Sequence, residues 1–178
     1  MMSVTTFCRI LCLSVLCVSV GCTAVPGKYL REAVPNLTFS TLAASPHLYQ
    51  DRLVLLGAVI VKEEMRDGDL WLHVKNRPLN ENYRPQLPPS PNDQEGGWYW
   101  IVVEKHQTFP RSYRHWADMT IVGRVTGAGP EGQPLLQLVY ARGWGMTSDH
   151  DGVWEHTVDA NYRAATPPKL IRESDQFQ

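Results

Sequence analysis

Two histidines near the carboxyl end lie among acidic residues and are the first candidates for chemistry. His150 and His156 are six positions apart, and four carboxylates surround them in the sequence: Asp149, Asp151, Glu155 and Asp159. Neutral imidazole and carboxylate oxygens are suitable ligands for zinc and similar ions. The spacing matches no familiar zinc motif, however, and the segment is polar. We therefore favour a charged, solvated loop over a metal site.

A catalytic nucleophile is hard to find in this chain. The sequence contains no Gly-X-Ser-X-Gly elbow, which is the turn that exposes a nucleophilic serine in many hydrolases. The cysteines all lie at or before position 22, and the acidic pair Glu63-Glu64 flanks a predicted turn, where we expect it to be solvated. We predict that the protein is not an enzyme and has no catalytic residue.

Tryptophans form the third set of candidates. Four of them are possible binding residues: Trp71, Trp98, Trp100 and Trp116. Indole rings stack on sugars and on bases, as the aromatic side chains of small β-barrels often do. Large aromatic side chains are mostly buried, so packing inside the fold is the favoured interpretation. Exposure of Trp71, Trp98 or Trp116 would favour binding, and burial of all three would count against it.

The chain is long enough for one ordinary domain and is nearly neutral. It has 178 residues and a formal net charge of -1. Arg9 is the only charged side chain before position 22, so the remainder is slightly more acidic than the whole. Binding to nucleic acid requires a basic surface. We therefore expect no nucleic-acid partner.

The amino terminus has the pattern of an export signal. Arg9 precedes an apolar run over residues 10–20, which is too short for a membrane-spanning helix of about 20 residues. Gly21 and Cys22 follow the run, and this segment resembles the lipobox of bacterial lipoproteins. The resemblance implies cleavage after Gly21 and a covalent lipid on Cys22. We expect no other cofactor.

The position and the surroundings of Cys22 have two further consequences. No cysteine follows it, so the mature protein cannot form an internal disulfide. Thr23 stands where an aspartate would indicate retention in the inner membrane of enteric-type bacteria. Delivery to the outer membrane is therefore the better prediction.

The chain divides into four predicted parts. Residues 1–21 form the signal peptide, residues 22–37 a lipidated tether without periodicity, residues 38–145 a β domain, and residues 146–178 an irregular extension. Within the domain, one helical turn is predicted at residues 39–44. Strands are predicted from apolar runs and alternation at residues 52–62, 69–75, 98–105, 119–126 and 135–142.

These strands predict a mostly β fold. Asp67-Gly68 is a good hairpin turn, and Gly57 lies in the middle of the first strand, where a glycine often marks a bulge or a barrel corner. A short helix is predicted between the third and fourth strands, at residues 108–118. We expect a small antiparallel Greek-key barrel of five or six strands, OB-like, with an open β-sandwich as the alternative. The proline-rich stretch at 76–97 is long for a loop.

Several segments in order resemble one lipoprotein family. They are Ser45-Pro46-His47-Leu48-Tyr49, the strand at 53–61 through Gly57, Leu70-Trp71-Leu72-His73-Val74 running into Arg77-Pro78-Leu79, and 119–127 after Phe109-Pro110. In order and spacing the chain is similar to the Slp family of starvation-inducible outer-membrane lipoproteins of Gram-negative bacteria. The resemblance covers roughly residues 37–145 together with the lipobox.

The resemblance implies a lipid-anchored protein on the periplasmic face of the outer membrane. Its expected role is non-enzymatic and either structural or stress-protective in the cell envelope. The alternative is a module that binds a glycan, a lipid or an envelope protein through its aromatic residues and the proline-rich loop.

Overall fold

The computed structural model describes residues 25–87, 93–105, 109, 118–144, 154–159 and 161–162. The predicted signal peptide, Gly21 and Cys22 lie outside these described residues, as do Trp116 and His150. Of the segment 108–118, in which a short helix is predicted, only Phe109 and Asp118 are described.

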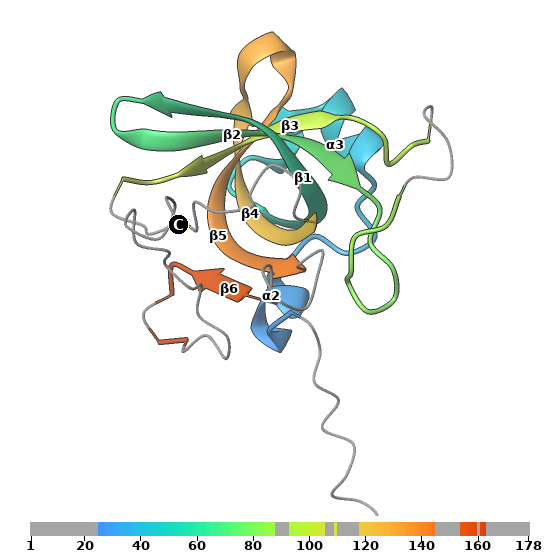
Figure 1. Cartoon of the computed structure of the whole chain (residues 1–178). Helices are drawn as coiled ribbons and strands as arrows, with labels where there is room; N and C mark the ends of the chain where they lie inside the picture. Colours follow the sequence, from blue (N-terminus) through green and yellow to red (C-terminus); the bar gives the residue numbers. More distant parts are fainter. Residues whose placement is uncertain are drawn as a thin grey trace, which may run out of the picture.

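Six strands and four short helical segments make up the described fold (Figure 1). The strands are β1 (Leu53–Arg66), β2 (Asp69–Arg77), β3 (Trp98–Val103), β4 (Asp118–Ala128), β5 (Pro134–Trp144) and β6 (Trp154–Thr157). The helical segments are α2 (Gly27–Glu32), α3 (Phe39–Ala44), η1 (Pro46–Tyr49) and η3 (Pro130–Gly132). The mostly β class is therefore confirmed, and each of the five predicted strands is present.

The sheet closes on itself. Its order is β3-β2-β1-β4-β5-β6, and every neighbouring pair in that order is antiparallel. A further pairing joins β3 to β5 in parallel, with Trp100 opposite Leu135 and Val102 opposite Gln137. Five strands thus form a ring, and β6 extends the sheet beyond it. The antiparallel pairing is as expected, whereas the parallel closure is not visible in the sequence pattern.

The interior of the ring follows from alternation along the strands. Leu72 and Val74 of β2 point inward with Tyr99 and Ile101 of β3, and all four are buried. The first part of β1, from Leu53 to Ile60, is apolar on both faces because both faces are covered there. Alternate residues of this part face the interior, and Leu53 belongs to a second buried cluster outside it. Helix α3 adds Phe39 and Leu42 to the cluster of buried side chains inside the ring. The members of this interior cluster are Phe39, Leu42, Val54, Leu56, Ala58, Ile60, Leu72, Val74, Tyr99, Ile101, Val103, Phe109, Met119, Ile121, Val125, Leu136, Leu138 and Ala141.

Two glycines in the first hairpin have different roles. Asp67 and Gly68 have φ values of 52° and 90°, as a tight two-residue hairpin turn requires, so the predicted turn is confirmed. Gly57 is not at a bulge, because the register shift of β1 lies between Ile60 and Lys62. A Cβ atom at position 57 would come within 2.2 Å of the Arg77 carbonyl oxygen, so close backbone approach requires this glycine.

Two predictions about the ends of the domain are wrong in their local structure. The predicted tether contains α2, and Val25 and Tyr29 are buried against the sheet. Val25 lies just before the helix and Tyr29 within it, and a helix of six residues is too short to show periodicity. The predicted irregular extension contains β6, whose four residues pair with β5.

Candidate functional site

An aromatic surface lies on the outer side of β2 and β3. Trp71 and His73 alternate along β2 with the inward-facing Leu72 and Val74, so their side chains point outward. Across the strand pair His73 lies opposite Trp100, and Lys75 lies opposite Trp98. We refer to Trp71, His73, Trp98 and Trp100 as the aromatic face.

The rings of the aromatic face contact one another. His73 is stacked on Trp100, with ring centroids 4.4 Å apart and an interplanar angle of 11°. Its other neighbour is Trp98, at 5.2 Å, and Trp71 contacts Trp100 edge-on at 6.1 Å. The four rings therefore form one continuous layer over two strands.

Two cations border this layer. The Arg66 guanidinium lies over the rings of Trp71 and Trp100, 4.5 and 5.0 Å from their centroids. Lys75 Nζ lies 5.7 Å from the Trp98 centroid. Arg66 Nε donates a 2.9 Å hydrogen bond to Glu64, which Lys62 also contacts. These hydrogen bonds from Lys62 and Arg66 lower the pKa of Glu64 from its ordinary value of 4.5.

Two loops flank the aromatic face. The β1–β2 turn at Asp67-Gly68 lies at one end of β2. The β4–β5 loop contributes Gln133, whose Oε1 is 2.8 Å from His73 Nε2, and Gly129, where an added Cβ would lie 3.4 Å from Trp100.

The predicted aromatic residues differ in exposure. Trp98 is 39% exposed, Trp71 is half-buried, and Trp100 is only 5% exposed. Packing is thus the right interpretation for Trp100, whereas Trp98 is partly accessible to solvent. By the criterion set out from the sequence, exposure of Trp98 favours a binding role. Trp116 lies outside the described residues.

The histidine and carboxylate segment is only partly a solvated loop. Glu155 and His156 are buried in β6, so the prediction of a solvated charged loop is wrong for these two residues. Glu155 Oε1 accepts hydrogen bonds from Tyr140 Oη at 3.0 Å and from Arg142 Nη1 at 2.8 Å. Burial, together with the Glu155 carboxylate, raises the pKa of Tyr140. Among the described residues, no group of three possible ligands is close enough to hold a metal ion.

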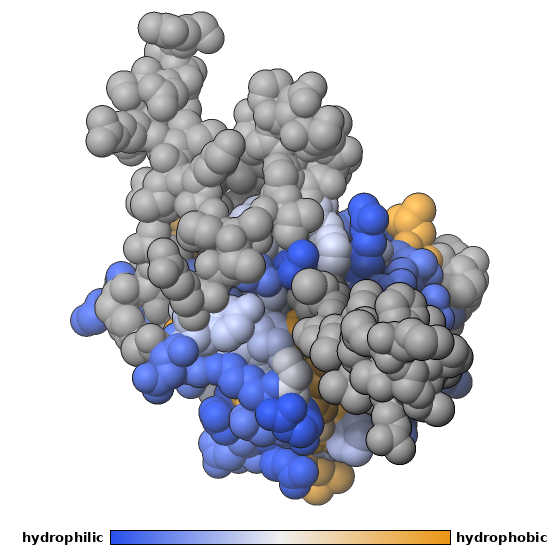
Figure 2. All heavy atoms as spheres, turned by 90° about the horizontal axis from the view of Figure 1, so that it is seen from below, coloured by the Kyte–Doolittle hydropathy of each residue, from blue (hydrophilic) through white to orange (hydrophobic). Residues whose placement is uncertain are grey.

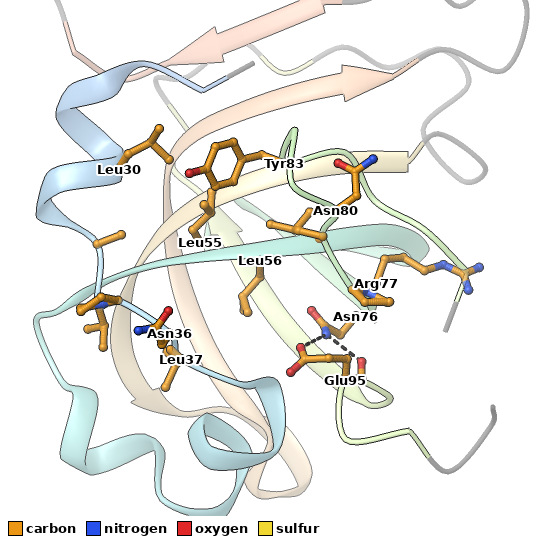
Figure 3. A pocket seen from close by; sticks show the side chains of 16 residues that line it. Leu30, Asn36, Leu37, Leu55, Leu56, Asn76, Arg77, Asn80, Tyr83 and Glu95 are labelled. Atoms are coloured by element: carbon orange, nitrogen blue, oxygen red, sulfur yellow. Dashed lines mark hydrogen bonds between the residues drawn. The ribbon is translucent and has the colours of Figure 1, made fainter. Parts of the chain in front are cut away.

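A pocket of about 500 Å³ opens between α2, β1 and the segment that follows β2 (Figure 3). Its walls are about equally polar and apolar, with Leu30, Leu55 and Tyr83 on one side. At its inner end Asn76 Nδ2 donates a 2.7 Å hydrogen bond to the backbone oxygen of Glu95. Sequence reasoning missed this pocket, although an asparagine at the inward-facing position after Leu72 and Val74 is the kind of signal that marks one.

The described helices are all short. None of them, over the part of the chain that the structure covers, is long and apolar enough to cross a membrane.

Comparison with known proteins identifies the family. The family model for the outer membrane lipoprotein Slp family matches residues 20–169, which is most of the chain. No curated protein matches the chain, and no solved structure does. The match covers the closed sheet, the aromatic face and the pocket, as well as Gly21 and Cys22. The chain therefore belongs to the outer membrane lipoprotein Slp family.

Proposed function

We propose that this protein is anchored in the outer membrane by lipid on Cys22, after cleavage at Gly21, and that its β domain faces the periplasm. The observation that carries the proposal is that the family match begins at residue 20 and so includes both residues. The apolar run at 10–20 and the single charge of Arg9 before it support export of the chain. One acyl chain binds a bilayer marginally and two or more hold it stably, so a fully acylated Cys22 is sufficient as an anchor.

The role that we propose is non-enzymatic and either structural or stress-protective in the envelope. His73 supports this role, because its ring packs against Trp98 and Trp100 and its Nε2 contacts Gln133. His156 is buried in β6 beside Phe109, with ring centroids 5.8 Å apart. Both histidines thus serve packing within the described part of the chain. We propose no cofactor other than the covalent lipid.

Metabolic labelling with radioactive palmitate tests the anchor. Wild-type cells should yield a labelled protein that sediments with the outer membrane, and Cys22→Ala should abolish both properties. Cys17→Ala is the matched control, because this cysteine lies in the predicted signal peptide and its loss should leave labelling unchanged. Equal labelling of wild type and Cys22→Ala would overturn the proposal.

A second candidate function is glycan binding by the aromatic face. The exposed Trp98 ring, the neighbouring Lys75 and the two flanking loops favour it, because sugar rings stack on indole and polar neighbours then bind the hydroxyl groups. Soluble glycan strands from peptidoglycan are the probe. Trp98→Ala should remove quenching of intrinsic fluorescence by this probe, whereas Leu48→Ala, which truncates an exposed side chain of η1, should not. Unchanged quenching in Trp98→Ala would exclude this face.

A further inference from the structure

The folded body begins very close to the proposed anchor. Val25 is fully buried and lies only three positions after Cys22. An extended chain spans at most about 3.6 Å per residue, so Cys22 and Val25 are separated by no more than about 11 Å. A free tether over residues 22–37 would instead allow the body to move some 50 Å from the lipid, by the same rule.

The segment after Val25 is fixed to the sheet and does not act as a hinge. The Tyr29 ring packs on Tyr140 of β5 at 5.3 Å, and Tyr29 Oη lies 3.0 Å from Thr157 Oγ1 of β6. Lys28 forms an ion pair with Asp159, just after β6. Helix α2 and strand β6 are therefore held together as one end of the body, and the position of Val25 determines which end lies nearest to Cys22.

This end lies away from the aromatic face. Figure 1 shows α2 and β6 together at the bottom of the view, with β2 and β3 near the top. Figure 2 looks at the same end from below, and the described atoms visible there are mainly hydrophilic. Arg31, Glu32 and Asn161 are exposed here, with Val158 as the exposed apolar side chain. A surface of this kind suits contact with lipid headgroups, because a surface that enters the hydrocarbon must be apolar.

We propose that the α2–β6 end rests on the headgroup layer of the bilayer and that the aromatic face is thereby turned away from the membrane. This inference rests on the proposed lipidation of Cys22. The partner of the α2–β6 end is the lipid surface, and the aromatic face remains accessible to molecules in the periplasm. The lipidated protein thus has a fixed orientation on its membrane.

Two matched cysteine variants test this orientation. Val158→Cys places a thiol at the α2–β6 end, and Val61→Cys places one on β1; the two valines are 42% and 48% exposed. The Val158 N–H donates a hydrogen bond to the Val139 carbonyl oxygen of β5. Tyr140, the next residue of β5, pairs with Val122 of β4, which in turn pairs with Leu55 of β1. Val61 is six residues further along β1 than Leu55, which corresponds to about 20 Å. Cys22 carries its lipid as a thioether, so a fluorophore reacts only with the introduced thiol.

The measurement is fluorescence quenching in proteoliposomes of phosphatidylethanolamine and phosphatidylglycerol that contain a lipid with a nitroxide headgroup. The label at position 158 should lose much of its emission, and the label at position 61 should lose little. Insertion of a Gly/Ser segment of about 15 residues between Ala24 and Val25, with a mean reach of roughly 20 Å, should remove the difference while the protein stays anchored.

Two outcomes separate this inference from the proposed function. Equal quenching at both positions in protein that carries palmitate would overturn the orientation and leave the anchor intact. Absence of palmitate on the wild-type chain would overturn the anchor itself, and the orientation with it.

Discussion

Asn76 Nδ2 donates a 2.7 Å hydrogen bond to the backbone oxygen of Glu95, and the Glu95 carboxylate accepts the Phe39 N–H at 3.1 Å. This chain of contacts links the end of β2 to the first residue of α3. A carboxylate at a helix N-terminus satisfies a backbone donor that has no partner within the helix. Helix α3 carries Phe39 and Leu42 into the interior of the ring, so this link holds one end of the core in place.

Replacement of Asn76 by alanine should therefore destabilise the whole domain. Asn76 is fully buried, and its loss would leave the Glu95 backbone oxygen without this donor. A buried polar group that loses its partner costs about 1–3 kcal/mol, and the free energy of unfolding in urea should fall by that amount. Asn82→Ala is the matched control, because Asn82 is exposed in the segment that follows β2. Equal free energies of unfolding for Asn76→Ala and Asn82→Ala would show that the hydrogen bond from Asn76 to Glu95 does not stabilise the domain.

Gly57→Ala should be among the most damaging single-methyl changes in the chain. The added Cβ would meet the Arg77 carbonyl oxygen at 2.2 Å, and a backbone atom cannot yield as a flexible side chain does. We expect a loss of about 3 kcal/mol in the free energy of unfolding. Gly129→Ala, whose Cβ would make contacts no closer than 3.4 Å, should cost about 0.5 kcal/mol or less. A reversed order of the two melting temperatures would contradict the close strand packing.

Tyr99→Phe should have a pH-dependent effect. Tyr99 Oη donates a buried 3.0 Å hydrogen bond to Gly57 O, so its removal should cost about 0.5–1.5 kcal/mol at neutral pH. Burial raises the pKa of Tyr99 well above its ordinary value of 10.0. The folded protein therefore keeps this proton when the unfolded chain has released it, and the contribution of Tyr99 to stability declines as pH rises above 10.0.

Urea denaturation of wild type and Tyr99→Phe, at pH 8 and at about pH 10.5, measures this linkage. The difference in unfolding free energy between the two proteins should shrink at the higher pH. A difference that stays constant, or grows, would show that the phenol of Tyr99 ionises at least as readily in the folded protein as in the unfolded chain.

Tyr29→Ala should release α2 from the sheet. The ring packs on Tyr140 and its hydroxyl contacts Thr157, so its removal leaves α2 with few buried contacts. Truncation of a buried aromatic side chain costs about 3 kcal/mol, part of which would appear as local opening. The Ala33 and Val34 amides, which bond to Tyr29 O and Leu53 O, should exchange faster with deuterium. Arg31→Ala on the exposed side of α2 should leave both exchange rates unchanged. Equal exchange rates in wild type, Tyr29→Ala and Arg31→Ala would show that the Tyr29 side chain does not hold α2 on the sheet.

The strands that could be predicted are those whose side chains alternate or form long apolar runs. The Asp67-Gly68 turn and α3 were also predictable, because the turn has a specific dipeptide and Pro46 follows the α3 segment closely. Helix α2 and strand β6 span six and four residues, so each is too short to produce a period, and tertiary contacts of Tyr29 and Glu155 stabilise them instead. The parallel pairing of β3 with β5 depends on how the sheet curls, which local sequence does not encode.

The candidate site was predictable in its residue types and not in its arrangement. Trp71, Trp98 and Trp100 do lie together, since alternation puts them on one side of two paired strands. Which indole side chain stays accessible depends on Arg66 and on the β4–β5 loop. The positions of both follow from the closure of the sheet. The pocket beside Asn76 joins α2, β1 and the segment after β2, and such a combination of distant segments becomes visible only in three dimensions.

The mass of the amino-terminal peptide of the natively purified protein tests the lipid anchor most directly. We predict a peptide that begins at Cys22 and carries a thioether-linked diacylglycerol together with an acyl chain on its amine. A peptide that begins at the initiator methionine, or one with an unmodified thiol at Cys22, would contradict both the anchor and the orientation derived from it.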